Sequence, residues 1–492
     1  MNQTIDIKRL GARFWVMPLA LTIALTGCSA QQSTTTDTTA TEEAAAEAAA
    51  DESTEATEEV QETAEATEEA TTSTTETFTL TRDDITVNET ISDDASESHA
   101  IVADGESASY ANIEVTKTGD ADGDEADFYG TNAAVFATNG GTLDLTDVIV
   151  TANGTHANAV FSYGEGSTVN ISNSLIETTG NCSGGIMVTG GGTLNATNLY
   201  IHTTGNSSAA IRSDRGGGTE NVNGGTYITD GKGSPVVYST ADVNVTGATM
   251  TSTSSQGVVV EGQNSVSLTD CVLTASNVSK NSDKSEWYQA VMIYQSMSGD
   301  ADEGEASFTM DGGSLTNTNG DVFFVNNTAC TISLKGATIV NEDAAGVLLR
   351  AAAAGWGNEG SNGGHVVFNL ANEQISGDIV VDSVSELNCY LTEGTSYEGA
   401  INADNAGAVY VEIESGSTWK LTGDSYVTSL TCDAGAIDLN GHTLYVNGEA
   451  YTDGSASTGT AVEFTLSSGN GGGMGGEGGP GGGGEPPAKP GE

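Results

Sequence analysis

Basic residues are scarce in this chain of 492 residues, which has 14 Lys and Arg against 68 Asp and Glu and a formal net charge of −54. A surface of that sign repels phosphate backbones and acidic lipid headgroups. The composition therefore argues against nucleic acid as a partner and against direct binding to anionic membranes. It favours solubility and leaves divalent cations as candidate ligands.

Cysteine is also scarce, and it forms no pattern of paired ligands. Beyond Cys28 the chain has an odd number of cysteines without a CxxC pair, so no zinc or redox motif is present. Cys271 falls at an apolar repeat position and is predicted to be a small core residue. The sequence leaves the disulfide state open for Cys182, Cys271, Cys330, Cys389 and Cys432.

Long hydrophobic runs are missing after the N-terminus. The run from Phe14 to Leu25 follows three basic residues and is too short for a permanent membrane span, so residues 1–28 are predicted to be an export signal. Its end, Leu25-Thr26-Gly27-Cys28, resembles the bacterial lipobox, which implies cleavage before Cys28 and its lipidation. We expect an exported protein that is attached to a bacterial membrane through this lipid anchor alone. The envelope type and the leaflet stay open.

Two further segments lack the apolar residues needed to fold. Residues 29–77 contain almost only Thr, Glu, Ala, Ser, Asp and Gln, and are predicted to be a disordered, extended acidic stalk. The Gly- and Pro-rich residues 468–492 are predicted to be a disordered tail. The folded part is then divided into a main repeat region, 78–365, and a C-terminal region of shorter coils with a cap, 366–467.

The folded part is built from a recurring unit of alternating apolar residues, as in "TLDLTD", "TVNISN" and "SVSLTD". Its apolar position recurs at spacings of 23 to 26 residues, apart from one of 42, from Leu145 to Leu334. A fixed period of this size indicates a solenoid, and alternation with many Val, Ile and Thr indicates strands. Two further strands follow in each unit.

Two residues after each such apolar position stands an Asp, Asn or Gly, the residues that tolerate a left-handed backbone. A tight bend once per coil explains this column. We therefore predict an all-β fold, a right-handed parallel β-helix with three short strands per coil of about 24 residues. The column consists of Asp147, Asn173, Asn198, Gly224, Gly247, Asp270, Gly312 and Gly336.

The shorter coils after Val366 include "GSTWKLTGDS", which resembles the C-terminal coils of autotransporter passengers. Residues 78–467 as a whole resemble exported bacterial β-helix proteins described as adhesin-like, within the pectate-lyase-like superfold. This resemblance implies the fold and a location at the cell surface. It implies no catalytic residues.

The third strand of each coil carries an outward column that is almost entirely apolar. A stripe of this kind suggests a binding face. Two alternatives stay open: the chain's own loops cover the stripe, or the assigned facing is off by one residue on some coils. The predicted column is Phe136, Phe161, Met187, Arg212, Val237, Val259, Met292, Phe323 and Leu348.

Two insertions, residues 295–306 and 351–364, leave the corner after this strand, with one coil between them. Asp300 and Asp302 of the first could approach Trp356 of the second. An indole beside carboxylates suits sugar binding, because the ring stacks on the sugar and the acids accept its hydroxyl hydrogens. The alternative is a solvated acidic loop. A third insertion, which carries Trp287, is placed to shield part of the stripe.

Arg212, Asp214 and Arg215 lie in "SSAAIRSDRGGG" and are the candidates for a lyase-like cluster. A hydrolase would instead need paired carboxylates in one groove. The neighbouring coils place Thr189 and Ser239 level with Asp214, so no stack of acids is evident. We expect these three residues to contact a ligand without catalysing its reaction.

"GDADGDEAD" places Asp120, Asp122 and Asp124 at alternate positions, as in a calcium loop. It departs from the EF-hand pattern, because Glu125 stands where glycine is needed. Calcium is therefore a candidate ligand rather than an expected cofactor.

The sequence as a whole favours a lipid-anchored, non-catalytic, adhesin-like or glycan-binding rod. Its expected partner is an extracellular glycan or the surface of a host or neighbouring cell. The alternative is a β-helix carbohydrate-active enzyme, either a polysaccharide lyase or a glycoside hydrolase.

Overall fold

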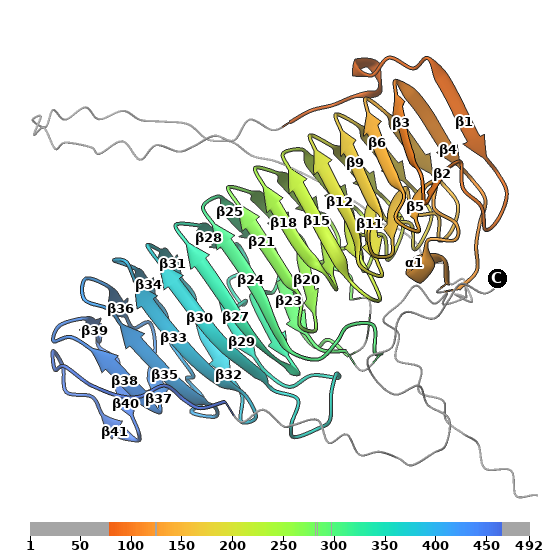
Figure 1. The fold of residues 1–492 in the computed structure, drawn as a ribbon. Helices are drawn as coiled ribbons and strands as arrows, with labels where there is room; N and C mark the ends of the chain where they lie inside the picture. The colour runs from red at the N-terminus through yellow and green to blue at the C-terminus, as the bar shows by residue number, and fades with distance from the viewer. Residues whose placement is uncertain (1–77, 124, 281, 283, 297, 465–492) are drawn as a thin grey trace, which may run out of the picture.

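The computed structural model describes residues 78–464 except positions 124, 281, 283 and 297. The predicted export signal, Cys28, the stalk and the tail from residue 468 lie outside the described residues. Within the described part, no helical segment combines the length and hydrophobicity needed to traverse a lipid bilayer. The described residues form a long stack of coils, with β1 (Glu89–Asp93) at one end and β41 (Glu449–Ala450) at the other (Figure 1).

Three long sheets, in which every strand pairs in parallel with the equivalent strand of the next coil, form the sides of the stack. Sheet A contains β1, β4 (Ile113–Lys117), β7 (Ile149–Ala152), β10 (Leu175–Thr178), β13 (Tyr200–Thr203), β16 (Thr226–Thr229), β19 (Thr249–Ser252), β22 (Val272–Ala275), β25 (Ser314–Asn317) and β28 (Thr338–Asn341). Sheet B contains β2 (Ile101–Asp104), β5 (Val135–Thr138), β8 (Val160–Tyr163), β11 (Ile186–Thr189), β14 (Ile211–Ser213), β17 (Val237–Ser239), β20 (Val258–Glu261), β23 (Gln289–Tyr294), β26 (Asp321–Asn326), β29 (Leu349–Ala351) and β32 (Ile379–Val381). Sheet C contains β3 (Ser107–Ala111), β6 (Thr142–Thr146), β9 (Thr168–Ser172), β12 (Gly192–Thr197), β15 (Gly218–Asn223), β18 (Asp242–Thr246), β21 (Ser265–Thr269), β24 (Glu305–Asp311), β27 (Thr328–Lys335), β30 (Gly364–Ala371), β33 (Glu386–Thr392), β35 (Ala408–Ile413) and β38 (Ser429–Cys432).

The coils change towards the C-terminus, where sheet A ends at β28 and a smaller parallel sheet takes its place. Sheet D contains β31 (Gln374–Ser376), β34 (Ser396–Glu398), β36 (Thr418–Lys420) and β39 (Ile437–Asp438). The last sheet contains β37 (Ser425–Val427), β40 (Leu444–Val446) and β41, and its β40–β41 pair is antiparallel. Sheet C continues through both regions, so it connects the main repeat to the shorter coils.

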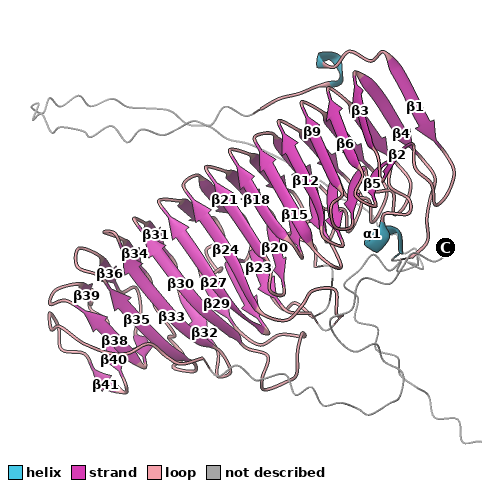
Figure 2. Cartoon of the chain, in the orientation of Figure 1, coloured by secondary structure: helices cyan, strands magenta, loops and turns pink. Residues whose placement is uncertain are grey.

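Helical structure among the described residues is limited to two short segments outside the sheets, η1 (Arg82–Asp84) and α1 (Glu125–Tyr129) (Figure 2). Arg82 of η1 forms ion pairs with Glu114 and Glu177 of sheet A.

Because its three long sheets are parallel and each coil adds one strand to each of them, the chain is a parallel β-helix with three strands per coil over its main part, as the repeat predicts.

The predicted bend once per coil is confirmed. All eight residues of the Asp/Asn/Gly column have a positive φ, from 49° at Asn173 to 67° at Gly312. In this conformation a β-branched or bulky side chain would clash with its own backbone. The residue types at this corner are therefore set by the turn between sheets C and A.

The predicted inward columns of sheets C and A are confirmed as well. Leu145, Ile171 and Ala196 pair in register on consecutive strands and are at most 2% exposed. Cys271 is fully buried in the same hydrophobic core, as expected for a small core residue. Equivalent side chains stack from coil to coil, so the core is a continuous column along the axis.

The predicted facing of sheet B is wrong on three coils. The inward positions that pair with Ile211, Val291 and Phe323 are Val237, Phe323 and Leu349, whereas Val237, Phe323 and Leu348 were predicted to face outward. Phe323, predicted to face outward, is fully buried in the core, as are Val237 and Leu348. These strands contain consecutive apolar residues, "VVY", "VFF" and "VLL". The alternation of apolar and polar residues therefore does not indicate which of their side chains face the core.

Candidate ligand-binding site

The outward row of sheet B runs along one side of the β-helix and is mostly buried. Its members pair in register from strand to strand. The sequence predicted one arginine in this row, Arg212, but the row contains two, Arg212 and Arg350. The chain's own insertions cover the row, which is one of the alternatives left open by the sequence. The row consists of Phe136, Phe161, Met187, Arg212, Tyr238, Val259, Met292, Phe324 and Arg350.

The loop that carries α1 covers the N-terminal part of this row. Phe136, Phe161 and Met187 form one buried cluster, and the Thr189 hydroxyl donates to the carbonyl oxygen of Phe128 at 2.7 Å. Phe161 and Met187 are fully buried. Neither is available to a ligand in this structure, contrary to the prediction that they form a binding face.

Gly130 lets the α1 loop lie close to the sheet. Its φ is +70°, and a Cβ there would lie 2.5 Å from a ring carbon of Phe136. A side chain at this position would therefore push the loop away from the row that it covers.

Arg212 is the next member of the row, and it is paired with two carboxylates. Its Nη1 lies 3.2 Å from Asp127 Oδ1 of α1, and its Nη2 lies 3.2 Å from Asp214 Oδ2. Asp127 is also hydrogen-bonded to His156 at 3.0 Å and to the amide of Asn158 at 3.2 Å. The side chains of Arg212, Asp127 and Asp214 are at most 6% exposed. The α1 loop that covers the row thus supplies the carboxylate of Asp127 to Arg212.

The two carboxylates that share Arg212 differ in their acidity. Burial acts to raise the pKa of Asp127, but the charge of Arg212 and the hydrogen bond from His156 outweigh it and hold the pKa below its usual value. Burial raises the pKa of Asp214 to about 7, and the nearby charges of Asp300 and Asp127 add to burial against the attraction of Arg212. Asp214 therefore titrates near neutral pH.

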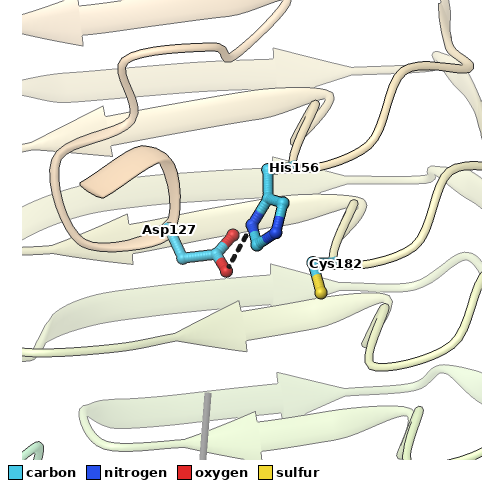
Figure 3. Close-up of side chains that lie close together, drawn as sticks. All are labelled: Asp127, His156 and Cys182. Carbon is cyan, nitrogen blue, oxygen red and sulfur yellow. Dashed lines mark hydrogen bonds and ion pairs between the residues drawn. The ribbon is translucent and has the colours of Figure 1, made fainter. Parts of the chain in front are cut away.

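Asp127 and His156 lie close to Cys182 at the edge of this network (Figure 3). Their potential ligand atoms all lie within 4.8 Å of one another, a set of donors that zinc accepts. Asp127, however, is already paired with Arg212, and the Cys182 sulfur has an interaction of its own. The arrangement is a charge-compensated network rather than an open metal site.

Arg215 contacts both the 295–306 insertion and the loop that carries α1. Its Nη2 lies 2.6 Å from Asp300 Oδ1, and its guanidinium carbon lies 4.0 Å from the ring centre of Phe128. Asp300 is buried by this pairing, whereas Asp302 is exposed. The structure therefore gives Asp300 to Arg215, and it does not place Asp300 or Asp302 at a sugar site with Trp356.

A second cluster covers the C-terminal part of the row. Val259, Met292 and Phe324 pack with Tyr294 and Trp356, the latter from the insertion after β29. Trp287, from the insertion before β23, packs on the same cluster, with its ring centre 5.5 Å from that of Phe324. The predicted shielding of the row by this insertion is confirmed.

A pocket of about 110 Å³ lies between the two clusters, where the cover of the row is interrupted. It is partly open to solvent. Its floor includes Arg212, Tyr238, Val259 and Met292, which belong to the row. The walls include Asp214, Gln256, Asn277, Lys280, Trp287, Tyr294 and Trp356. Arg212, Asp214 and Trp356, three of the residues predicted to contact a ligand, therefore line the same pocket.

Two lining residues carry buried polar atoms that have no partner among the residues the structure describes. These atoms are the indole Nε1 of Trp356 and the side-chain oxygen of Asn277. Trp356 is 5% exposed and Asn277 is 2% exposed. An unpaired buried donor or acceptor is costly, and it is commonly satisfied by a bound molecule or water.

The candidate calcium loop, which contains Asp120 and Asp122, is hydrogen-bonded to the neighbouring coil. Asp120 Oδ1 accepts a hydrogen bond from the backbone N–H of Thr155 at 2.7 Å, so it binds to the next coil. Asp120 and Asp122 are exposed, and Asp124 lies outside the described residues. The described part of this loop does not form a set of converging oxygen ligands.

Several pocket residues were not identified from the sequence. Tyr238 occupies the outward row itself, but the error of one residue on its coil hid it. Tyr294 lies two residues after Met292 and pairs with Glu261, so alternation places it on the outward side, but the predicted column included only the first outward position of each strand. Asn277, Gln256 and Lys280 come from corners and an insertion, whose paths the repeat does not determine.

Comparison with known proteins gives no further assignment: no protein-family model, no curated protein and no solved structure matches this chain.

Proposed function

We propose that the protein is a cell-surface lipoprotein whose β-helix is a non-catalytic, adhesin-like rod that binds glycans. The binding site is the pocket above Arg212, which we call the Arg212 pocket. The observation that carries this proposal is its lining: Trp287, Trp356, Tyr238 and Tyr294 surround a partly open cavity that also offers charged and amide groups. Aromatic faces with a few polar groups suit sugar rings, which have apolar faces and hydroxyl edges.

The single carboxylate in the pocket favours binding over catalysis. Among the described residues that line it, Asp214 is the only acid, and its carboxylate is paired with Arg212. Glycoside hydrolysis by the common mechanisms needs two carboxyl groups that flank one bond. The Arg212 guanidinium is held by two acids and is not placed to act as a base.

A carbohydrate-active enzyme is the second candidate, and one observation favours it. The pKa of Asp214, which burial raises to about 7, suits a general acid. The other buried acids on this side already have partners: Asp127 pairs with Arg212 and Asp300 pairs with Arg215. Glu261 accepts hydrogen bonds from the hydroxyl groups of Tyr238 and Tyr294 at 2.5 Å and 2.8 Å. Those tyrosines stand between Glu261 and the pocket that they line.

The location at the cell surface is supported by the sequence of residues 1–28. The lipobox-like end at Cys28 would anchor the chain, and the acidic segment of residues 29–77 would hold the β-helix away from the membrane. The glycan partner would then be a host surface, a neighbouring cell or a free polysaccharide.

The test is a glycan array probed with the purified full chain, combined with an assay for new reducing ends and unsaturated products. Binding of glycans without any product supports the proposal. Turnover of a bound polysaccharide would favour the enzyme. Absence of binding to every glycan would contradict both candidates.

A further inference from the structure

We infer that the Arg212 pocket takes a single uncharged pyranose ring at the end of a glycan chain. This inference rests on the proposed function and names the class of sugar. It follows from the size of the pocket, the balance of its charges, the support behind one tryptophan and the unpaired polar atoms in its walls.

The size of the pocket limits the ligand to one ring. Its volume is about 110 Å³, less than the roughly 150 Å³ of a buried cavity that holds one benzene ring in another protein, so the pocket encloses part of one sugar ring and has no room for a second. The Arg212 pocket is also partly open to solvent, so the rest of the sugar and of a glycan chain can extend out of it. A terminal sugar has one linkage that must leave the pocket, whereas an internal sugar has linkages on both sides that must leave it.

The charges of the pocket favour a neutral ligand. Arg212 is the basic group of the floor, but Asp127 and Asp214 already neutralise it at 3.2 Å each. An anionic sugar would therefore meet the carboxylate of Asp214 and a guanidinium whose charge is already compensated. Lys280 in the wall and Arg212 in the floor likewise oppose a cationic ligand in this aromatic pocket.

Trp287 provides the stacking platform. The guanidinium of Arg350 lies 4.7 Å from the ring centre of Trp287 and so supports one of its faces. Arg350 is itself fixed by Asp321, whose carboxylate oxygens lie 2.6 Å and 3.3 Å from its Nε and Nη2. Trp287 also lines the pocket and is half-buried, so the exposed part of its indole can stack on a sugar ring.

The unpaired atoms in the walls match the groups that a sugar carries. The indole Nε1 of Trp356 donates only, and the side-chain oxygen of Asn277 accepts only. Each hydroxyl group of a sugar can donate and accept, so a sugar offers partners for both kinds of atom. A purely apolar ring would leave both atoms unsatisfied.

The experiment titrates the full chain with methyl glycosides of glucose, galactose and mannose, and with glucuronate and choline as charged probes of similar size. Binding is followed by tryptophan fluorescence and by saturation-transfer NMR. We expect at least one neutral glycoside to bind, with a loss of more than tenfold in Trp287→Ala. We expect a loss of three- to tenfold in Trp356→Phe, which keeps the ring and removes the donor. Tyr445→Ala, remote from the pocket, is the matched control and should bind normally.

Preferential binding of glucuronate or choline would overturn the inference. So would array binding that needs internal sugars and is not competed by any methyl glycoside, although the proposed glycan-binding function would then stand. Array binding that is unaffected by Trp287→Ala would also overturn it, because the site would lie elsewhere. A chain that binds no glycan on the array fails at the proposed function itself.

Discussion

The guanidinium of Arg212 on β14 lies 3.2 Å from the carboxylate of Asp127 on α1, 85 residues earlier in the chain. This contact joins the loop that covers the N-terminal part of the outward row to the floor of the pocket. It also explains why an arginine stands in an apolar row: the covering loop brings a carboxylate to that position.

Replacing Arg212 by Met should destabilise the protein, although it would make the row uniformly apolar. Asp127 and Asp214 would then be buried without their cation, which costs about 3–5 kcal/mol for a buried ion pair with one partner removed. Denaturant unfolding of Arg212→Met measures this loss. Adding Asp127→Asn and Asp214→Asn should restore much of the stability, and a failure of this rescue would show that Arg212 acts through its packing instead.

The stability contributed by Asp214 should depend on pH. Burial raises its pKa in the folded chain to about 7, whereas an unfolded aspartate titrates near about 3.9. The folded state therefore holds a proton that the unfolded state has released between about pH 4 and pH 7, and stability falls as pH rises through this window. The slope is at most about 1.4 kcal/mol per pH unit.

Asp214→Asn removes this titration and should flatten that part of the profile. The measurement is the difference in unfolding free energy between the wild-type chain and Asp214→Asn across the window. A difference that stays constant from about pH 4 to pH 7 would contradict the raised pKa.

Glu220 should be a destabilising residue in the core. It points inward on β15, between Leu194 and Val243 of the adjacent coils, and neither of its carboxylate oxygens has a partner among the described residues. Burial raises its pKa well above the usual value, because the charged form is not stabilised in the core. Glu220→Leu should increase the free energy of unfolding by about 1–3 kcal/mol. Glu220→Gln, which stays polar, should give little of this gain; equal effects of both changes would count against the argument.

Arg215→Ala should loosen the insertion that contains Asp300. Asp300 is buried and loses the ion pair at 2.6 Å that fixes it to the coil of Arg215. Hydrogen exchange of the backbone amides at 298–302 should become faster, while the amides of β14 keep their protection. Unchanged exchange in this segment would mean that other contacts hold the insertion.

The bends of the β-helix were predictable from the sequence because a left-handed backbone admits few residue types. The column from Asp147 to Gly336 therefore identified the corner on every coil. The inward columns of sheets C and A were predictable for a similar reason, since their outer faces are polar and the alternation is clear.

Sheet B was harder to predict because both of its faces are buried. Phe323 lies in the core and Phe324 lies under the second cluster, so both are apolar and the sequence carries no facing signal. The pocket depends on insertions from several coils, and their paths are set by contacts such as those of Arg215 with Asp300 and of Arg350 with Asp321. Such contacts join residues far apart in sequence, which a repeat alignment does not bring together.

The central claim is that glycans bind at the Arg212 pocket, and it is tested most directly by comparing the full chain with Trp287→Ala on one glycan array. Thermal unfolding of both proteins controls for folding. The account predicts that the wild-type chain binds a set of glycans with neutral terminal sugars and that folded Trp287→Ala loses this binding. Equal binding by the two proteins would contradict it.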